Sequence, residues 1–325
     1  MTGLSDSFHR PINYLRISVT DRCNFNCRYC RPPDDTHYLA RKEVLSYEEI
    51  VTVVQAVAGL GVNKVRLTGG EPLVRRGLGR LVDMLSAIPG IDDLALTTNG
   101  RLLSRFALRL KKAGLHRVNV SLDTLRPGRF AEISGRDDLN EVLQGLERAE
   151  RVGLQPVKIN MVVMGGVNDD EVLEFGRLTI DRGWNVRFIE LMPFGRADGA
   201  QFIPVSQVAR VLSALGDMEP CFAKDGGGPA KYFRFPGARG TVGFIGAVSE
   251  HFCFGCNRLR LTADGKLRPC LMGEEIVDLR PVLRSGAPLF EVREVILQAA
   301  ALKPAGHLLT HGIGPQDATM SHIGG

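Results

Sequence analysis

The feature that most constrains the fold is a repeated alternation of short β-branched runs with amphipathic helical stretches, from Ile12 to about Ser213. Six runs have the length and composition of buried strands: residues 14–20, 64–68, 94–99, 117–123, 156–164 and 186–192. Helical patterns follow them at residues 47–59, 78–88, 105–113, 139–152, 170–182 and 206–215. Six strand-then-helix units in series predict an α/β fold with a parallel sheet and right-handed crossovers. The sheet is either an open doubly wound sheet or a partial (β/α) barrel.

Capping signals stand at the ends of these predicted helices. Ser46 followed by Glu49 matches a capping box at the start of the first helix. Glycines occupy the places of helix C-caps at four further ends: Gly59, Gly114, Gly153 and Gly183.

Polar residues follow the carboxyl ends of most of the predicted strands. They occupy residues 21–22, 69–72, 97–100, 121–123 and 192–193. An ordinary turn would explain any one of these segments, but five at equivalent positions favour a shared site. In both candidate folds, ligands bind at the carboxyl ends of the strands.

Composition excludes several classes of protein. The 325 residues are 44% hydrophobic and 24% charged, which suits a globular core, and the net charge of +5 is weak and scattered. We therefore expect no nucleic-acid partner. No apolar run approaches the ~18 residues of a membrane span. Polar residues precede any apolar run at the amino terminus, so we expect no secretory signal and a cytoplasmic location.

The strand–helix pattern changes after Pro204, and the glycine-rich segment 226–229 breaks it. We place a domain boundary near residue 220. Residues 1–220 would form the strand–helix domain, and residues 221–325 a small C-terminal lobe with a hairpin and a cysteine-bearing loop.

The seven cysteines form two triplets and a remainder. The triplets are C-x3-C-x2-C at Cys23, Cys27 and Cys30, and C-x2-C-x13-C at Cys253, Cys256 and Cys270, with Cys221 left over. In a reducing cytosol such cysteines are more often metal ligands than disulfides. Structural zinc and electron-transfer clusters prefer four protein ligands, whereas three thiolates on a [4Fe–4S] cluster leave one iron free for a small molecule.

Zinc is the alternative at both triplets. His37 would supply the fourth ligand at the first triplet, and His251 at the second.

The segment from Cys23 to Cys30, together with Gly69-Gly70-Glu71-Pro72, resembles the radical S-adenosylmethionine superfamily. The resemblance implies a partial (β/α)6 barrel. It also implies that the amine and carboxylate of S-adenosylmethionine chelate the free iron of the first [4Fe–4S] cluster, while the glycine motif contacts the same moiety.

Beside the second triplet, Arg258 and Arg260 alternate on a predicted strand, so both face one side, as suits an anion with several oxygens. With residues 244–246 and 250–253 and the terminal Gly324-Gly325, this region resembles the GTP 3′,8-cyclase family of molybdenum cofactor biosynthesis. The resemblance implies that a 5′-deoxyadenosyl radical takes hydrogen from ribose C3′ of GTP, and that C3′ then bonds to guanine C8. A second [4Fe–4S] cluster would hold the base.

The same resemblance implies individual site residues. The GTP contacts would be Arg16, Arg66, Thr97, Lys158, Arg258 and Arg260. The S-adenosylmethionine contacts would be Tyr29, Gly70, Ser121 and Met192, and the tail residues Gly324 and Gly325 would reach the active site. The residues themselves agree in part, because Arg16, Arg66 and Lys158 each lie within a predicted strand, where a charge suits a polar cavity. Met192 is more typical of packing.

We expect a reductant protein such as a flavodoxin, a downstream cyclic pyranopterin monophosphate synthase, and a monomer or homodimer. Two other functions compete. One is a radical peptide-modifying maturase with an auxiliary cluster, although such tails generally carry more cysteines. The other is an iron–sulfur electron carrier, for which two open clusters would be a poor design.

Overall fold

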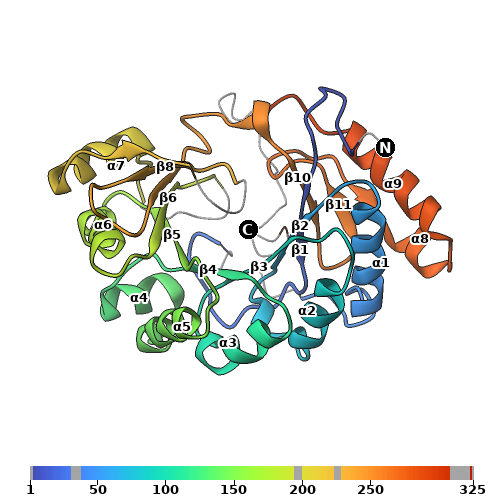
Figure 1. The fold of residues 1–325 in the computed structure, drawn as a ribbon, viewed down its shortest axis with the longest axis horizontal. Helices are drawn as coiled ribbons and strands as arrows, with labels where there is room; N and C mark the ends of the chain where they lie inside the picture. The colour runs from blue at the N-terminus through green and yellow to red at the C-terminus, as the bar shows by residue number, and fades with distance from the viewer. Residues whose placement is uncertain (1–2, 31–37, 194–199, 223–227, 308–322, 324–325) are drawn as a thin grey trace.

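The computed structural model describes residues 3–30, 38–193, 200–222, 228–307 and 323. Its sheet is built around six parallel strands in chain order: β1 (Tyr14–Ser18), β2 (Lys64–Thr68), β3 (Asp93–Thr98), β4 (Arg117–Ser121), β5 (Lys158–Val163) and β6 (Asn185–Glu190). The six predicted strands are confirmed, most of them a few residues shorter than predicted. The strands curve around a central space, with helices outside them (Figure 1). This arrangement agrees with a partial barrel.

Helices connect the strands and form the outer layer. They are α1 (Tyr47–Ala58), α2 (Leu78–Ser86), α3 (Leu103–Lys112), α4 (Pro127–Ser134), α5 (Leu139–Arg151), α6 (Val172–Asp181) and α7 (Val205–Leu212). Short 3₁₀ turns stand at η1 (Pro72–Val74), η2 (Asp169–Glu171) and η3 (Ser213–Leu215). The predicted capping box is present, because Ser46 Oγ accepts from the Glu49 amide at 3.0 Å. The Ser46 amide in turn donates to Glu49 Oε2 at 2.6 Å. Helix α4 was not predicted.

The chain from Glu219 onward joins both edges of this sheet. On one edge β10 (Arg258–Leu261) runs parallel to β1 and is followed by antiparallel β11 (Lys266–Arg268) and β12 (Val277–Asp278). On the other edge β9 (Val242–Ile245) runs parallel to β6, with antiparallel β8 (Lys231–Arg234) and β7 (Glu219–Pro220) beyond it. Helices α8 (Arg280–Arg284) and α9 (Leu289–Ala301) follow, and α9 packs beside α1. Among the described residues, strands of the predicted C-terminal lobe therefore join the barrel strands in one twelve-stranded sheet.

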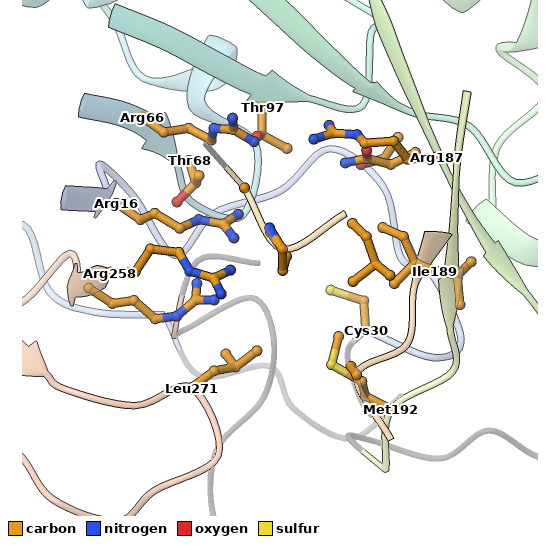
Figure 2. A pocket seen from close by; sticks show the side chains of 18 of the residues that line it. Arg16, Cys30, Arg66, Thr68, Thr97, Arg187, Ile189, Met192, Arg258 and Leu271 are labelled. Atoms are coloured by element: carbon orange, nitrogen blue, oxygen red, sulfur yellow. The ribbon is translucent and has the colours of Figure 1, made fainter. Parts of the chain in front are cut away.

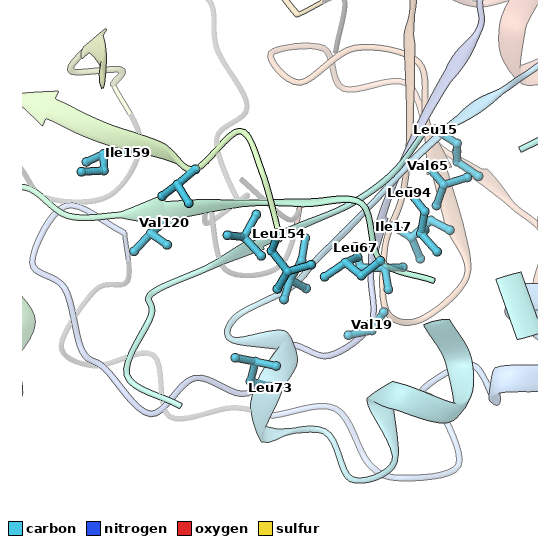
Figure 3. Packing of buried hydrophobic residues seen from close by; sticks show 14 of the residues in the cluster. Leu15, Ile17, Val19, Val65, Leu67, Leu73, Leu94, Val120, Leu154 and Ile159 are labelled. Carbon is cyan, nitrogen blue, oxygen red and sulfur yellow. The ribbon is translucent and has the colours of Figure 1, made fainter. Parts of the chain in front are cut away.

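Side chains alternate between the two faces of the parallel strands. Arg16 and Arg66 project into the central space (Figure 2). Leu15, Ile17 and Val65 point the other way into the main core and are fully buried (Figure 3). Each such buried aliphatic side chain contributes roughly 1.5–3 kcal/mol. The apolar core thus lies between sheet and helices, which leaves the inner face free for polar groups.

Within the described part of the chain, no helix is both long and apolar enough to span a bilayer.

Candidate functional site

Three arginines form a row across adjacent strands on the inner face. Arg16 of β1 is directly opposite Arg260 of β10 on one side and Arg66 of β2 on the other. All three line one cavity, and Arg16 and Arg66 can be followed in Figure 2. Like charges directly opposite each other on a sheet are destabilising, so this row favours a bound anion.

Burial of these three arginines disfavours their charged forms, and their pKa values are lowered as a result. Arg66 is 7% exposed and Arg260 is 6% exposed. Burial lowers the pKa of each guanidinium from 12.5 to about 10. Burial and then the neighbouring Arg260 and Arg66 hold the pKa of Arg16 well below its ordinary value. Three cations buried on one face of the cavity make this face suited to an anion.

Further predicted substrate residues line the same cavity. Arg258 lies two residues before Arg260 on β10, and its guanidinium carbon is 5.1 Å from the centre of the Phe252 ring. Lys158 of β5 is 3% exposed. Thr97 of β3 also faces the cavity. The structure therefore brings all six predicted GTP contacts together; their roles stay a prediction.

Arg187 of β6 is a cavity residue that sequence reasoning missed. It is 4% exposed, and its Nε and Nη2 have no hydrogen-bond partner among the described residues. The signal was available, since Arg187 lies within a predicted strand just as Arg66 and Lys158 do. It adds a further cation to the inner face.

The first cysteine triplet lies in the loop after β1 and lines the same cavity. Cys23, Cys27 and Cys30 are not in disulfides. Burial raises the pKa of Cys23 to about 11 and the pKa of Cys27 well above its ordinary value. Burial therefore keeps these two thiols protonated at neutral pH, and a bound metal would deprotonate them.

The glycine motif after β2 packs tightly against this loop. A Cβ on Gly70 would lie only 2.4 Å from the carbonyl oxygen of Arg22. The Glu71 carboxylate accepts hydrogen bonds from Thr98 Oγ1 and the Asn99 amide, each at 2.7 Å. Burial raises the pKa of Glu71 to about 7. The motif therefore fixes the ends of β2 and β3 beside the loop that carries Cys23.

The residues predicted to contact S-adenosylmethionine also border the cavity, namely Tyr29, Gly70, Ser121 and Met192. Tyr29 donates a hydrogen bond to Asp123 Oδ2 at 2.7 Å, and Asp123 Oδ1 accepts from the Val162 amide at 2.8 Å. Burial raises the pKa of Asp123 to about 6. Asp123, which follows β4, was not predicted as a site residue, although it belongs to one of the polar segments after the strands. It orients Tyr29.

The second triplet approaches the cavity from the C-terminal part of the chain. Cys253 opens the 3₁₀ turn η4 (Cys253–Gly255), Cys256 precedes β10, and Cys270 follows β11. All three are free of disulfides and line the cavity. Burial alone would raise the pKa of Cys256, but Arg258 and Lys303 bring it down to about 7.

Histidines lie beside one cysteine of this triplet. The ligand atoms of His251, Cys253 and His307 are within 4.8 Å of one another. The two imidazoles contact each other, with His251 Nδ1 3.1 Å from His307 Nε2. Cys256 and Cys270 are not part of this group, so the described residues do not gather the complete zinc site predicted from His251 and the second triplet. His37, the corresponding residue for the first triplet, lies outside the described residues.

The predicted tail residues Gly324 and Gly325 also lie outside the described residues. Ile323, which precedes them, is 2% exposed and packs against Met272. Met192 and Cys270 border the same small cluster.

Comparisons with known proteins divide the chain into two parts. Residues 17–179 match the family model of the radical SAM superfamily, and residues 184–309 match the model Molybdenum Cofactor Synthesis C. Curated relatives match over the whole length. The chain is 52% identical to the GTP 3′,8-cyclase of Pelotomaculum thermopropionicum, covering 99% of this chain and 100% of the relative. It is 47% identical to that of Moorella thermoacetica, with the same coverage.

A solved structure shows the fold. Streptococcus suis SuiB bound to S-adenosylmethionine superposes with a TM-score of 0.63 and 15% identity, covering 87% of this chain and 68% of that one. Together with the radical SAM family model over residues 17–179, this likeness confirms the predicted α/β fold.

Proposed function

Because this chain belongs to the GTP 3′,8-cyclase family of radical S-adenosylmethionine enzymes, it catalyses the first step of molybdenum cofactor biosynthesis, and we propose how its residues divide that work. The reaction converts GTP into (8S)-3′,8-cyclo-7,8-dihydroguanosine 5′-triphosphate and cleaves S-adenosylmethionine to 5′-deoxyadenosine and methionine. Two [4Fe–4S] clusters serve it. A peptide-modifying maturase is not favoured, because the C-terminal family model and the full-length relatives are those of the cyclase.

The first triplet would hold the cluster that binds S-adenosylmethionine. When bound, the two together supply a 5′-deoxyadenosyl radical by one-electron cleavage of the sulfonium. Cys23, Cys27 and Cys30 would ligate three irons and leave the fourth for the methionine moiety. Contacts to S-adenosylmethionine would come from Tyr29, Gly70, Ser121 and Met192. Asp123 would keep the Tyr29 ring in place through the hydrogen bond at 2.7 Å.

The single observation that carries the substrate site is the buried row Arg260–Arg16–Arg66. Three adjacent cations inside a sheet repel one another, so a triphosphate on the inner face would relieve a cost that the protein bears without it. Each charge-assisted hydrogen bond to phosphate is worth roughly 1.5–3 kcal/mol. The full set of GTP contacts would be Arg16, Arg66, Thr97, Lys158, Arg258 and Arg260.

The second triplet would orient the base. Cys253, Cys256 and Cys270 would hold a cluster whose free iron binds guanine, so that C8 faces ribose C3′. Fixing two reacting atoms of one molecule in near-attack geometry yields large effective molarities. The first and second triplets border one cavity, which supports this arrangement. The tail residues Gly324 and Gly325 would close the site, and the burial of Ile323 beside Met272 supports that role.

Several finer assignments complete the proposal. We infer a division into residues 1–220 as the radical barrel and 221–325 as the region that carries the second cluster and substrate contacts. The reductant would be a protein such as a flavodoxin, and the product would pass to a cyclic pyranopterin monophosphate synthase. The enzyme would work in the cytoplasm as a monomer or homodimer, without nucleic acid.

The decisive experiment combines metal content with product analysis. Anaerobically reconstituted protein should contain about eight irons per chain, and the triple variant Cys253→Ala/Cys256→Ala/Cys270→Ala about four. With GTP, S-adenosylmethionine and dithionite, only the unaltered protein should give a cyclised product with a new C3′–C8 bond by mass spectrometry and NMR. Stoichiometric zinc and four irons in the unaltered protein would refute the assignment of the second triplet.

A further inference from the structure

Two buried cations join the second cysteine triplet to the two ends of the chain. One is Lys303, which follows helix α9, and the other is Arg10, which precedes β1. Lys303 is 3% exposed and Arg10 is 7% exposed. Neither is among the residues that line the cavity, so neither is placed to bind GTP directly.

Lys303 connects the segments that carry Cys256 and Cys270. Its Nζ donates to the carbonyl oxygen of Arg258 at 2.8 Å and to that of Pro269 at 2.6 Å. Arg258 comes two residues after Cys256, and Pro269 immediately precedes Cys270. A single ammonium thus fixes the distance between two cysteine-bearing segments. The Lys303 side chain also hydrogen-bonds to Cys256, so its charge lies next to that sulfur.

Arg10 fixes the remaining cysteine. Its Nη1 donates to the carbonyl oxygens of Cys253 and Ala305, both at 2.8 Å. Its Nη2 donates to Pro304 O at 2.6 Å, and its Nε pairs with Asp6 at 2.6 Å. Arg10 therefore binds the backbone of Cys253 and the segment directly after Lys303, which links the two cations into one network.

Burying the charge of Lys303 costs more free energy than holding these segments together requires. Burying an ammonium is costly even when it satisfies two carbonyl oxygens, and a neutral donor could satisfy them without the cost of burying a charge. The charge itself is therefore best explained by negative charge beside it. Thiolates of a bound cluster supply such charge, and it grows by one when the cluster is reduced. Hydrogen bonds and charges near the sulfurs are among the factors that set the potentials of iron–sulfur clusters.

We propose that Lys303 is a positioning residue of the second cluster, which holds Cys256 and Cys270 at ligating distance and raises the cluster's reduction potential, while Arg10 holds Cys253. The inference rests on the proposed assignment of the second triplet as cluster ligands. Removal of the Lys303 charge then disfavours the reduced cluster, since reduction adds negative charge next to it.

The test compares Lys303→Met with Lys266→Met. Lys266 lies on β11 in the same region, and its side chain is 41% exposed and paired with Asp264, so it controls for the loss of one lysine. Iron per chain and an anaerobic redox titration followed by EPR are measured on both, with the first cluster as internal reference. In Lys303→Met the second cluster should be at least tenfold less reduced at a fixed potential, which is 59 mV for one electron. The first cluster and Lys266→Met should be unchanged.

Loss of about four irons from Lys303→Met, with the first cluster retained, would also support the proposal, because the ligands would no longer be held. Two intact clusters with unchanged potentials would overturn it. If Lys303→Met fails to fold, Lys303→Gln, which keeps a donor but no charge, decides by the same titration. If the unaltered protein itself holds only four irons, the cluster assignment fails rather than the inference about Lys303.

Discussion

Replacing Arg66 with methionine should weaken GTP binding and stabilise the GTP-free enzyme at the same time. Burial lowers the pKa of Arg66 from 12.5 to about 10. At 1.36 kcal/mol for each pH unit, keeping this guanidinium charged at neutral pH costs the folded protein about 3 kcal/mol. The Arg66 Nε has no hydrogen-bond partner among the described residues, so little is lost in return. The contact of Arg66 with the Tyr14 ring, at 5.4 Å, offsets about 0.5–2 kcal/mol.

The net gain of about 1–2.5 kcal/mol should raise the melting temperature of the cluster-loaded, GTP-free protein by a few degrees. GTP should bind roughly 10–150-fold more weakly, because one charge-assisted phosphate contact of about 1.5–3 kcal/mol is lost. Anaerobic melting curves and an equilibrium GTP titration measure the two effects. Opposite signs of the two are what distinguish a binding residue from a structural one.

Arg117→Met is the matched control. Arg117 of β4 is 2% exposed, pairs with Asp93, and is not among the residues that line the cavity. Its removal leaves a carboxylate without its partner, so the melting temperature should fall while GTP affinity stays unchanged. The reasoning is refuted if Arg66→Met also lowers the melting temperature, or if it binds GTP as tightly as the unaltered protein.

Three further outcomes are expected. Cys27→Ser should abolish 5′-deoxyadenosine formation, whereas Arg258→Ala should weaken GTP binding but keep slow, uncoupled cleavage of S-adenosylmethionine. Chromatography of the nucleoside products measures both, and equal amounts of 5′-deoxyadenosine from the two variants would contradict this. Deleting Gly324 and Gly325 should nearly abolish cyclisation while iron content and GTP affinity stay roughly intact, and full activity would return the tail to an ordinary terminus. Burial raises the folded-state pKa of Glu71 from 4.5 to about 7. As pH rises, Glu71 therefore loses its proton in the unfolded chain before it does so in the folded protein. The free energy of unfolding should fall between about pH 4.5 and 7, by up to about 3 kcal/mol. Glu71→Gln should flatten that slope in melting curves, and an unchanged slope would show that another group causes it.

The strands were predictable because one face of each strand packs against apolar helices and the other faces a polar cavity. Leu15 and Ile17 are fully buried against the helices while Arg16 faces the cavity, and this alternation is written directly in the sequence. Helix α4 was not predicted, because Pro127–Ser134 spans only about two turns and its N-cap residue, Arg126, makes no side-chain capping bond. Two local signals do mark its ends, namely Pro127 in the first turn and Gly135 in a left-handed conformation at the C-cap.

The site was predictable in its residue types but not in its geometry. A charge within a buried strand indicates a polar cavity. This argument identified Arg66 and Lys158 as cavity residues, and it applies equally to Arg187. That Arg260 stands opposite Arg16 could not be read from the sequence, because the choice of partner strand is made by the tertiary fold. Asp123 was missed as a site residue since its role is to hold Tyr29, and such contacts leave no spacing pattern.

The pairing of β1 with β10 has a consequence for folding during synthesis on the ribosome. Tyr14 leaves the ribosome well before its partner Arg258, which follows about 240 residues later. At 5–20 residues per second, the first strand waits on the order of 10–50 seconds for the strand that covers its outer edge. During that time one flank of an aliphatic sheet is open to pairing with other chains. A chaperone that shields nascent β1 during this time should therefore improve the yield of the folded enzyme.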